Sequence, residues 1–159
     1  MPQLVFEGRT QTGQAALDFG VTDLLVREGP NGPTLYTISG QAGGLTAYNV
    51  ANQGAASVMD FAYFDAAWSD GVRDLALVEV NGAISLAVAA SGTSQVRMFA
   101  VNGDGSIGQG TLLNGVNTAN NRSADLSQWG DDMLFMAPEA SGQIQGYTVS
   151  PSGETVKPW

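Results

Sequence analysis

Two tryptophan-containing segments and one amide–guanidinium pair carry the side-chain types that bind sugars. An indole ring stacks on the C–H face of a sugar, while carboxylate, amide and guanidinium groups bond its hydroxyls. Each tryptophan lies near a turn that holds an aspartate. The candidates for binding a glycan or a partner are Trp68, Asp70, Asn121, Arg122, Trp129 and Asp131. The alternative is that the tryptophans pack between sheets as core residues.

Three aspartates recur at a fixed interval and could bind a cation. Asp23, Asp74 and Asp125 are separated by 51 residues each time, and a leucine follows each of them. If the repeats surround an axis, the three carboxylates meet there, and a set of oxygen ligands suits Ca²⁺ or Mg²⁺. No other cofactor is expected, so calcium is the one to test. The alternative is that each aspartate accepts backbone N–H bonds in a turn before a strand.

The sequence contains no cysteine and no histidine. Thiol nucleophiles, histidine bases, Ser-His-Asp triads and Cys/His zinc sites are therefore excluded. The remaining catalytic option is a pair of carboxylates, as in glycoside hydrolysis. Its candidates are Glu7, Glu28, Glu79 and Glu139. The spacing of these glutamates predicts no distance between them, so we predict no catalytic residue and expect a non-enzyme.

The charge balance restricts the partners. Six basic residues stand against fifteen acidic ones, which gives a formal net charge of -9. Such a surface repels phosphate backbones and anionic lipids, so nucleic-acid binding is disfavoured. The first ten residues lack the basic and apolar regions of a signal peptide, and no apolar run is long enough to span a membrane. These features predict synthesis as a soluble cytoplasmic protein.

An internal repeat of about fifty residues organises the chain. Each copy contains an aromatic residue, one further residue and a valine, preceded by a Ser-Gly pair. The three instances are Tyr48-Asn49-Val50, Phe99-Ala100-Val101 and Tyr147-Thr148-Val149. Repeats of this length are typical of propeller blades and stacked arrays. We predict one domain over residues 1–159, with a lead-in at 1–21 and repeats at 22–72, 73–123 and 124–159.

Each repeat has the pattern of four short strands in meander order, which is typical of an all-β propeller blade. In the second repeat, Asn81-Gly82 is a strong hairpin signal, and 102–105 forms another tight turn. The strands are expected near 23–27, 34–38, 45–50 and 56–64, near 74–80, 84–90, 96–101 and 110–113, and near 125–129, 133–137, 144–149 and 155–156. No segment keeps a helical period, so no helix is expected.

The third repeat is truncated, because little of its outermost strand remains. A surplus strand at 4–7 precedes the first repeat and could supply what is missing by exchange. Three blades are fewer than the usual four to eight, so we expect the ring to be completed by oligomerisation or strand exchange. The alternatives are a three-repeat sheet array or a sandwich made from the same meanders.

The stretch Ala89-Ala90-Ser91-Gly92, followed by 96–105, resembles blades of lactonase-type β-propellers. It is also similar to the repeats that precede calcium-binding repeats in secreted bacterial proteins. This resemblance implies a propeller fold. Lactonase activity does not carry over, because the lactonase site uses a histidine that this chain lacks. The calcium-binding nonapeptides are absent as well.

Together these features predict a non-enzymatic binding or structural module that forms a homo-oligomer. Its expected ligand is a cell-surface glycan or a partner protein. Short, signal-less β-repeat chains are typical of spikes, fibres and tail components of phage-like particles or gene transfer agents, so release on a virion-like particle is part of this hypothesis. The alternative is a fragment-like propeller enzyme of the lactonase or glycoside hydrolase type that uses acidic residues.

Overall fold

The computed structural model describes residues 9–40, 43–50, 56–64, 72–90, 95–113, 124–129, 133–138, 144–149 and 156–158. Only the backbone is described for residues 124–129, 133–138, 156–158 and a few strand ends. Most described residues lie in β-strands, so the predicted all-β class is confirmed.

The first two repeats each form a four-stranded antiparallel sheet. The first contains β1 (Val21–Gly29), β2 (Gly32–Ser39), β3 (Gly44–Val50) and β4 (Ala56–Tyr63), in that order. The second contains β5 (Val72–Val80), β6 (Ala83–Ala90), β7 (Gln95–Val101) and β8 (Ile107–Leu112), also in chain order. Both are meanders, as the strand pattern predicts.

The backbone of the third repeat pairs in the same way. Its strands are β9 (Ala124–Trp129), β10 (Met133–Pro138), β11 (Gln145–Val149) and β12 (Val156–Pro158). The outermost strand is short, as expected, and pairs with Tyr147–Val149 of the same chain. Residues 4–7, which were expected to complete this sheet from a neighbouring copy, lie outside the described residues. The exchange therefore stays a prediction.

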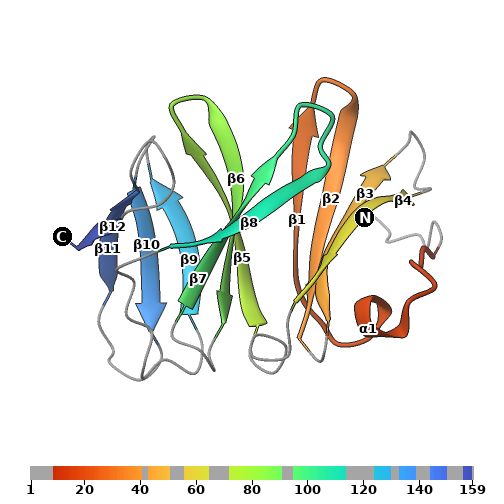
Figure 1. Ribbon diagram of the computed structural model, residues 1–159, viewed down its shortest axis with the longest axis horizontal. Helices are drawn as coiled ribbons and strands as arrows, with labels where there is room; N and C mark the ends of the chain where they lie inside the picture. The colour runs from red at the N-terminus through yellow and green to blue at the C-terminus, as the bar shows by residue number, and fades with distance from the viewer. Residues whose placement is uncertain are drawn as a thin grey trace, which may run out of the picture.

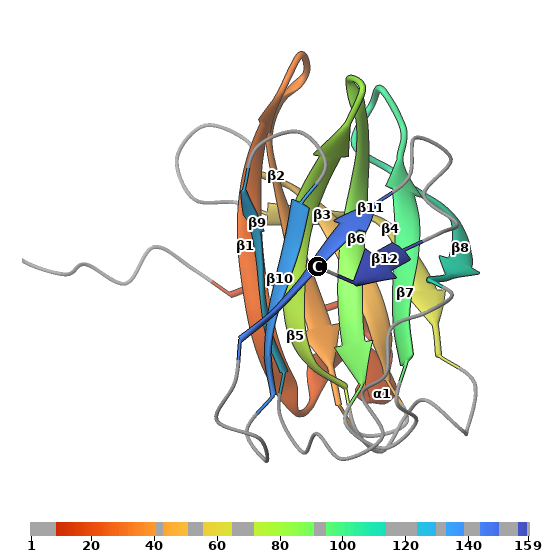
Figure 2. The same cartoon turned by 90° about the vertical axis from the view of Figure 1, so that its left-hand side faces the viewer.

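The sheets lie in a row (Figure 1), with the C-terminus at one end and the β1–β4 sheet at the other. The first strands lie next to each other, because β5 contacts both β1 and β9. Figure 2, seen from the C-terminal end, shows the sheets one behind another with their strands running in similar directions. The described residues form neither a closed ring nor, beyond backbone pairing, a third blade, so the propeller stays a prediction.

The middle sheet is buried on both faces, and its strands alternate between two cores. Toward the first sheet, the core contains Tyr36, Ile38, Leu45, Ala47, Phe64, Leu75, Leu86, Val88 and Phe99. Toward β11, it contains Ala76, Val78, Val80, Ala87, Ala89, Val96, Met98, Leu113, Tyr147 and Val149. Because each face meets the neighbouring repeat, the stability of a repeat depends on the next one.

Two turns confirm the hairpin signals. Asn81 and Gly82 have φ angles of 52° and 78°, which is the conformation of a two-residue type I′ turn. Between β7 and β8, the backbone N–H of Asn102 donates to the Ser106 carbonyl oxygen at 3.0 Å. Gly105 has a φ of 94°, which favours glycine there.

The prediction that the chain has no helix is wrong. A single helical turn, α1 (Ala15–Asp18), precedes β1. It is too short to show a helical period, and tertiary contacts hold it: Leu17 is buried beneath it against the first sheet. Within the described residues, no helix is long and apolar enough to cross a membrane.

Candidate functional site

The predicted sugar platform falls largely outside the described residues. This applies to Trp68, Asp70, Asn121, Arg122 and Asp131. Trp129 ends β9, where its backbone pairs with Met133, and its side chain is not described. The glycan site therefore stays a prediction, and a functional surface has to be sought among the described residues.

Asp23 joins the first two sheets. A bulge precedes it in β1, and a bulge at the equivalent position precedes Asp74 in β5. Its Oδ1 accepts the backbone N–H of Leu24 at 2.7 Å, and its Oδ2 accepts that of Leu75 at 2.9 Å. Asp23 therefore accepts backbone N–H bonds, although from within a strand and not from a turn. One of these bonds crosses to the next repeat.

The other two aspartates of the proposed cation site do not join Asp23 in a described cluster. Asp74 is half-buried in β5, and the backbone of Asp125 pairs with Ala137 in the third sheet. Among the residues with described side chains, no three His, Cys, Asp or Glu residues come together in a way that could hold a metal. The calcium site remains a prediction from the repeat.

Two further polar bridges between the first two sheets were not predicted. Asp60 in β4 accepts the backbone N–H of Ile107 at 2.9 Å, and the Tyr36 hydroxyl donates to the Gly105 carbonyl oxygen at 2.7 Å. Burial raises the pKa of Tyr36, so this hydroxyl stays protonated and keeps its role as donor. The repeat could not reveal Asp60, because Thr111 stands at the equivalent position of the second repeat.

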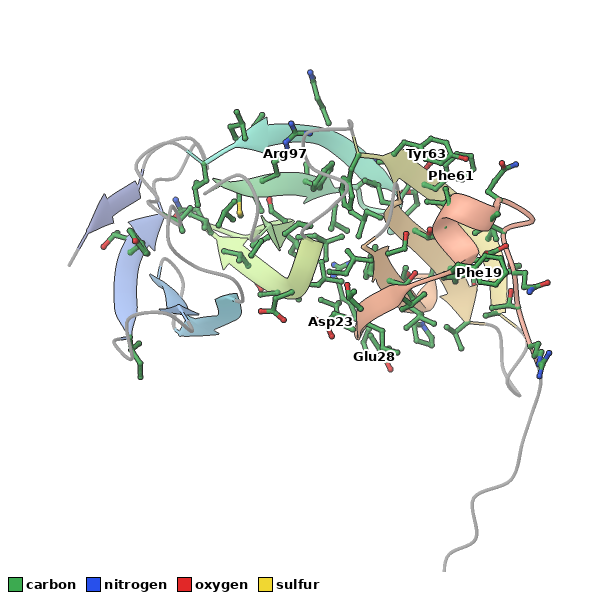
Figure 3. The ribbon with its side chains drawn as sticks, turned by 90° about the horizontal axis from the view of Figure 1, so that it is seen from below. Phe19, Asp23, Glu28, Phe61, Tyr63 and Arg97 are labelled. Atoms are coloured by element: carbon green, nitrogen blue, oxygen red, sulfur yellow. The ribbon has the colours of Figure 1, made fainter. Side chains whose placement is uncertain are left out.

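We expect Asp23→Asn to lower the free energy of unfolding by about 1–2 kcal/mol, because a single amide oxygen replaces two charged acceptors. Glu28→Gln is the matched control, since Glu28 lies exposed on the same strand (Figure 3). Urea unfolding of both variants measures the difference. Equal stability of the two variants would contradict a bridging role for Asp23.

A cavity of about 460 Å³ lies where the β1 hairpin end meets the turns of the second sheet. Arg27 lines it together with residues around Ser85 and Asn102. The Nη1 atom of Arg27 is buried and has no hydrogen-bond partner. Arg27 is the one charged side chain among the residues that line this cavity.

The front face is defined here as the side of the β1–β4 sheet that is turned away from β5–β8. Residues paired across neighbouring strands lie on the same face. Val26 pairs with Leu35, which pairs with Tyr48, and Phe61 pairs with Thr46. The face therefore carries Leu24, Val26, Leu35, Thr46, Tyr48, Phe61 and Tyr63.

The lead-in segment, residues 9–20, covers the middle of the front face. Leu17 is buried there, and a groove of about 330 Å³ beside it is lined by Val21, Leu35 and Tyr48. Gly44 makes room for Leu17, since a Cβ atom at this position would collide with the Leu17 side chain. The Ser39 hydroxyl donates to the Ala16 carbonyl oxygen at 3.0 Å and fixes α1 to the sheet.

The Asp18 carboxylate holds the lead-in segment together by three hydrogen bonds to Thr12 and Gly13. Its carboxylate accepts the backbone N–H of Thr12 at 2.7 Å, the Thr12 hydroxyl at 2.8 Å and the backbone N–H of Gly13 at 3.0 Å. The backbone bond from Thr12 is the main reason that the pKa of Asp18 lies below its ordinary value. These three hydrogen bonds are thus strongest while Asp18 is ionised.

Apolar side chains remain exposed on both sides of this cover. The β1 strip, defined as Val21, Leu24 and Val26, runs along the first strand. On β4, the rings of Phe61 and Tyr63 lie 5.4 Å apart with an interplanar angle of 69°. Figure 3 shows these two rings and Phe19 at the end of the molecule away from β9–β12. The exposed apolar side chains thus form two groups, one on β1 and one on β4, with the lead-in segment between them.

No family model, curated protein or solved structure matches the chain. The resemblance to propeller repeats therefore rests on the sequence pattern alone.

Proposed function

We propose that this chain is a non-enzymatic binding and structural module that works as part of an oligomer, with the front face as its docking surface. One observation carries the proposal. Leu24 is 58% exposed, whereas Leu75, at the equivalent position of the second repeat, is 6% exposed and packs against the first sheet. Val26 is likewise 58% exposed, and its counterpart Leu77 packs against the same core.

The first sheet thus carries side chains suited to packing against a preceding sheet, although no described sheet precedes it. Because Leu24 and Val26 are each 58% exposed, covering them gains part of the roughly 1.5–3 kcal/mol that full burial of such a side chain is worth. A repeat whose outer face meets only solvent usually has a polar outer face. These points favour a partner that covers the β1 strip.

The carboxylates support a structural role. Asp18, Asp23, Asp60 and Asp104 each accept at least one backbone N–H bond. Such carboxylates stabilise turns and sheet contacts, a role that needs no substrate. Recognition of a glycan, closure of a propeller ring by strand exchange and incorporation into a virion-like particle remain parts of the proposal, and the sequence pattern alone supports them.

Sedimentation velocity over a range of concentrations tests the oligomer. We expect the unmodified chain to sediment as a multimer, and the double variant Leu24→Ser, Val26→Ser to sediment as a monomer with an unchanged β-sheet circular dichroism spectrum. Leu112→Ser is the control, because Leu112 is an exposed leucine on β8, away from the front face. A strictly monomeric unmodified chain at all concentrations would overturn the proposal.

A further inference from the structure

We infer that copies of this chain join head to tail: the front face of one copy packs against the back face of the next. The back face is the side of the β9–β12 sheet that is turned away from β5–β8. This inference rests on the proposed oligomer and goes beyond it, because it names the two surfaces that meet.

The third repeat carries an exposed residue whose counterparts in the first two repeats are buried. Leu45, Val96 and Ile144 each lie three residues before the aromatic residue of their repeat. Leu45 packs between the first and second sheets, and Val96 between the second sheet and β11, and both are 0% exposed. Ile144 is 76% exposed. Ile144, which directly precedes β11, thus has the repeat position of a core residue, but no described sheet covers it.

The front face also carries an exposed residue, Leu24, whose counterpart in the second repeat is buried. At the first internal interface, Leu45 of one sheet shares a core with Leu75 of the next. Leu75 corresponds to Leu24, and Leu45 corresponds to Ile144. Placing the β1 strip of one copy against Ile144 of another copy repeats, between chains, the contact that already exists within the chain.

The polarity of the contact follows from the repeat. Each internal interface joins the back side of one sheet to the front side of the following sheet, so the two sides of a sheet are different surfaces. The second sheet presents Leu75, Leu86 and Phe99 on its front side, but Ala87 and Ala89 on its back side. A contact of two front faces has no counterpart within the chain. The expected interface is therefore heterologous, and such interfaces form closed rings or open fibres.

The lead-in segment competes with the incoming copy. Tyr48 is the counterpart of Phe99, which is buried in the core between the first two sheets. In the described structure, Leu17 and Tyr48 line the same groove beneath the lead-in segment. Full docking of a second copy therefore requires the lead-in segment to move aside. The segment limits assembly as long as its hydrogen bonds to the Asp18 carboxylate are intact.

Cysteine cross-linking tests the polarity, because the chain has no native cysteine. We expect a mixture of Leu24→Cys and Ile144→Cys chains to give a cross-linked dimer with a short bis-maleimide, and each variant alone to give several-fold less. The control mixture of Leu112→Cys and Ile144→Cys should give the same low yield as the single variants. Adding Asp18→Ala to both partners should raise the yield, because it releases the lead-in segment.

The outcomes separate the two proposals. If the unmodified chain is a multimer but Leu24→Cys alone gives the dominant dimer, the head-to-tail contact is wrong and the oligomer stands. If the mixture cross-links no better than the Leu112→Cys control, the head-to-tail contact is also wrong. If the unmodified chain is a monomer at every concentration, the oligomer itself fails. A lower yield with Asp18→Ala would show that the lead-in segment supports docking, which contradicts the competition inferred here.

Discussion

Replacing Gly44 with valine is expected to lower the free energy of unfolding by about 3 kcal/mol, the upper end of the usual cost of overpacking. Gly44 begins β3 opposite Tyr63 of β4. A side chain at this position would collide with the carbonyl oxygen of Ala62, a backbone atom that cannot move without disturbing the pairing of β3 with β4. Urea unfolding followed by circular dichroism measures the loss.

Gly103→Ala is the control for this substitution. Gly103 lies in the turn between β7 and β8, and a Cβ atom added there has no heavy atom within 4 Å. We expect its stability to stay within about 0.5 kcal/mol of the unmodified chain. If Gly44→Val is as stable as Gly103→Ala, then the front face has more room than its packing indicates. The burial of Leu17 would then not require glycine at position 44.

Gly44→Val also bears on the lead-in segment. The same Cβ atom would collide with Leu17, so the variant should detach α1 even where the sheet survives. Limited proteolysis within residues 9–20 reports this detachment separately from global unfolding. Faster cleavage in Gly44→Val than in Gly103→Ala, at a urea concentration where both are folded, is the expected result.

Local sequence signals predicted most of the strands because each strand is bounded by turn residues with a specific conformation. Asn81-Gly82 is the clearest example, since both residues adopt the positive φ angles of a type I′ turn. The strand positions of the first two repeats follow from these turn residues and from the recurrence of the aspartate and the aromatic residue. These signals are local and repeated, so one sequence contains them more than once.

The features that the sequence did not predict depend on single contacts between distant segments. Helix α1 is one turn long and is held by Leu17 and Ser39, which are separated by a whole hairpin. Asp60 and Tyr36 bridge two sheets, but neither position repeats as the same residue. A period detects what recurs, and these contacts occur once.

The exposure of the β1 strip illustrates a different limit. Leu24 and Leu75 are the same residue at equivalent positions, and the sequence pattern treats them alike. Their environments differ because a sheet precedes Leu75, whereas no described sheet precedes Leu24. Burial in a repeat protein is a property of the interface between repeats, so the pattern identifies a packing surface without identifying which copy of it is covered.

Substituting these two leucines separates the two roles of the repeat. Leu75→Ala should lower the free energy of unfolding by about 3 kcal/mol, because it leaves a cavity in the core shared by the first two sheets. Leu24→Ala should cost less than about 0.5 kcal/mol in dilute solution, because the side chain is already exposed there. Urea unfolding at low protein concentration measures both.

The same pair behaves differently when the chain assembles. As concentration rises, a multimer stabilises the folded state by mass action, so the unmodified chain should become more resistant to unfolding. Leu24→Ala should show a smaller gain, since Leu24 is buried in the assembled form and the truncated side chain leaves part of that contact unfilled. Leu75→Ala should keep a concentration-dependent gain on top of its lower starting stability. If Leu24→Ala follows the unmodified chain at every concentration, the front face is not a docking surface, and its resemblance to the buried side of the second sheet has no functional consequence.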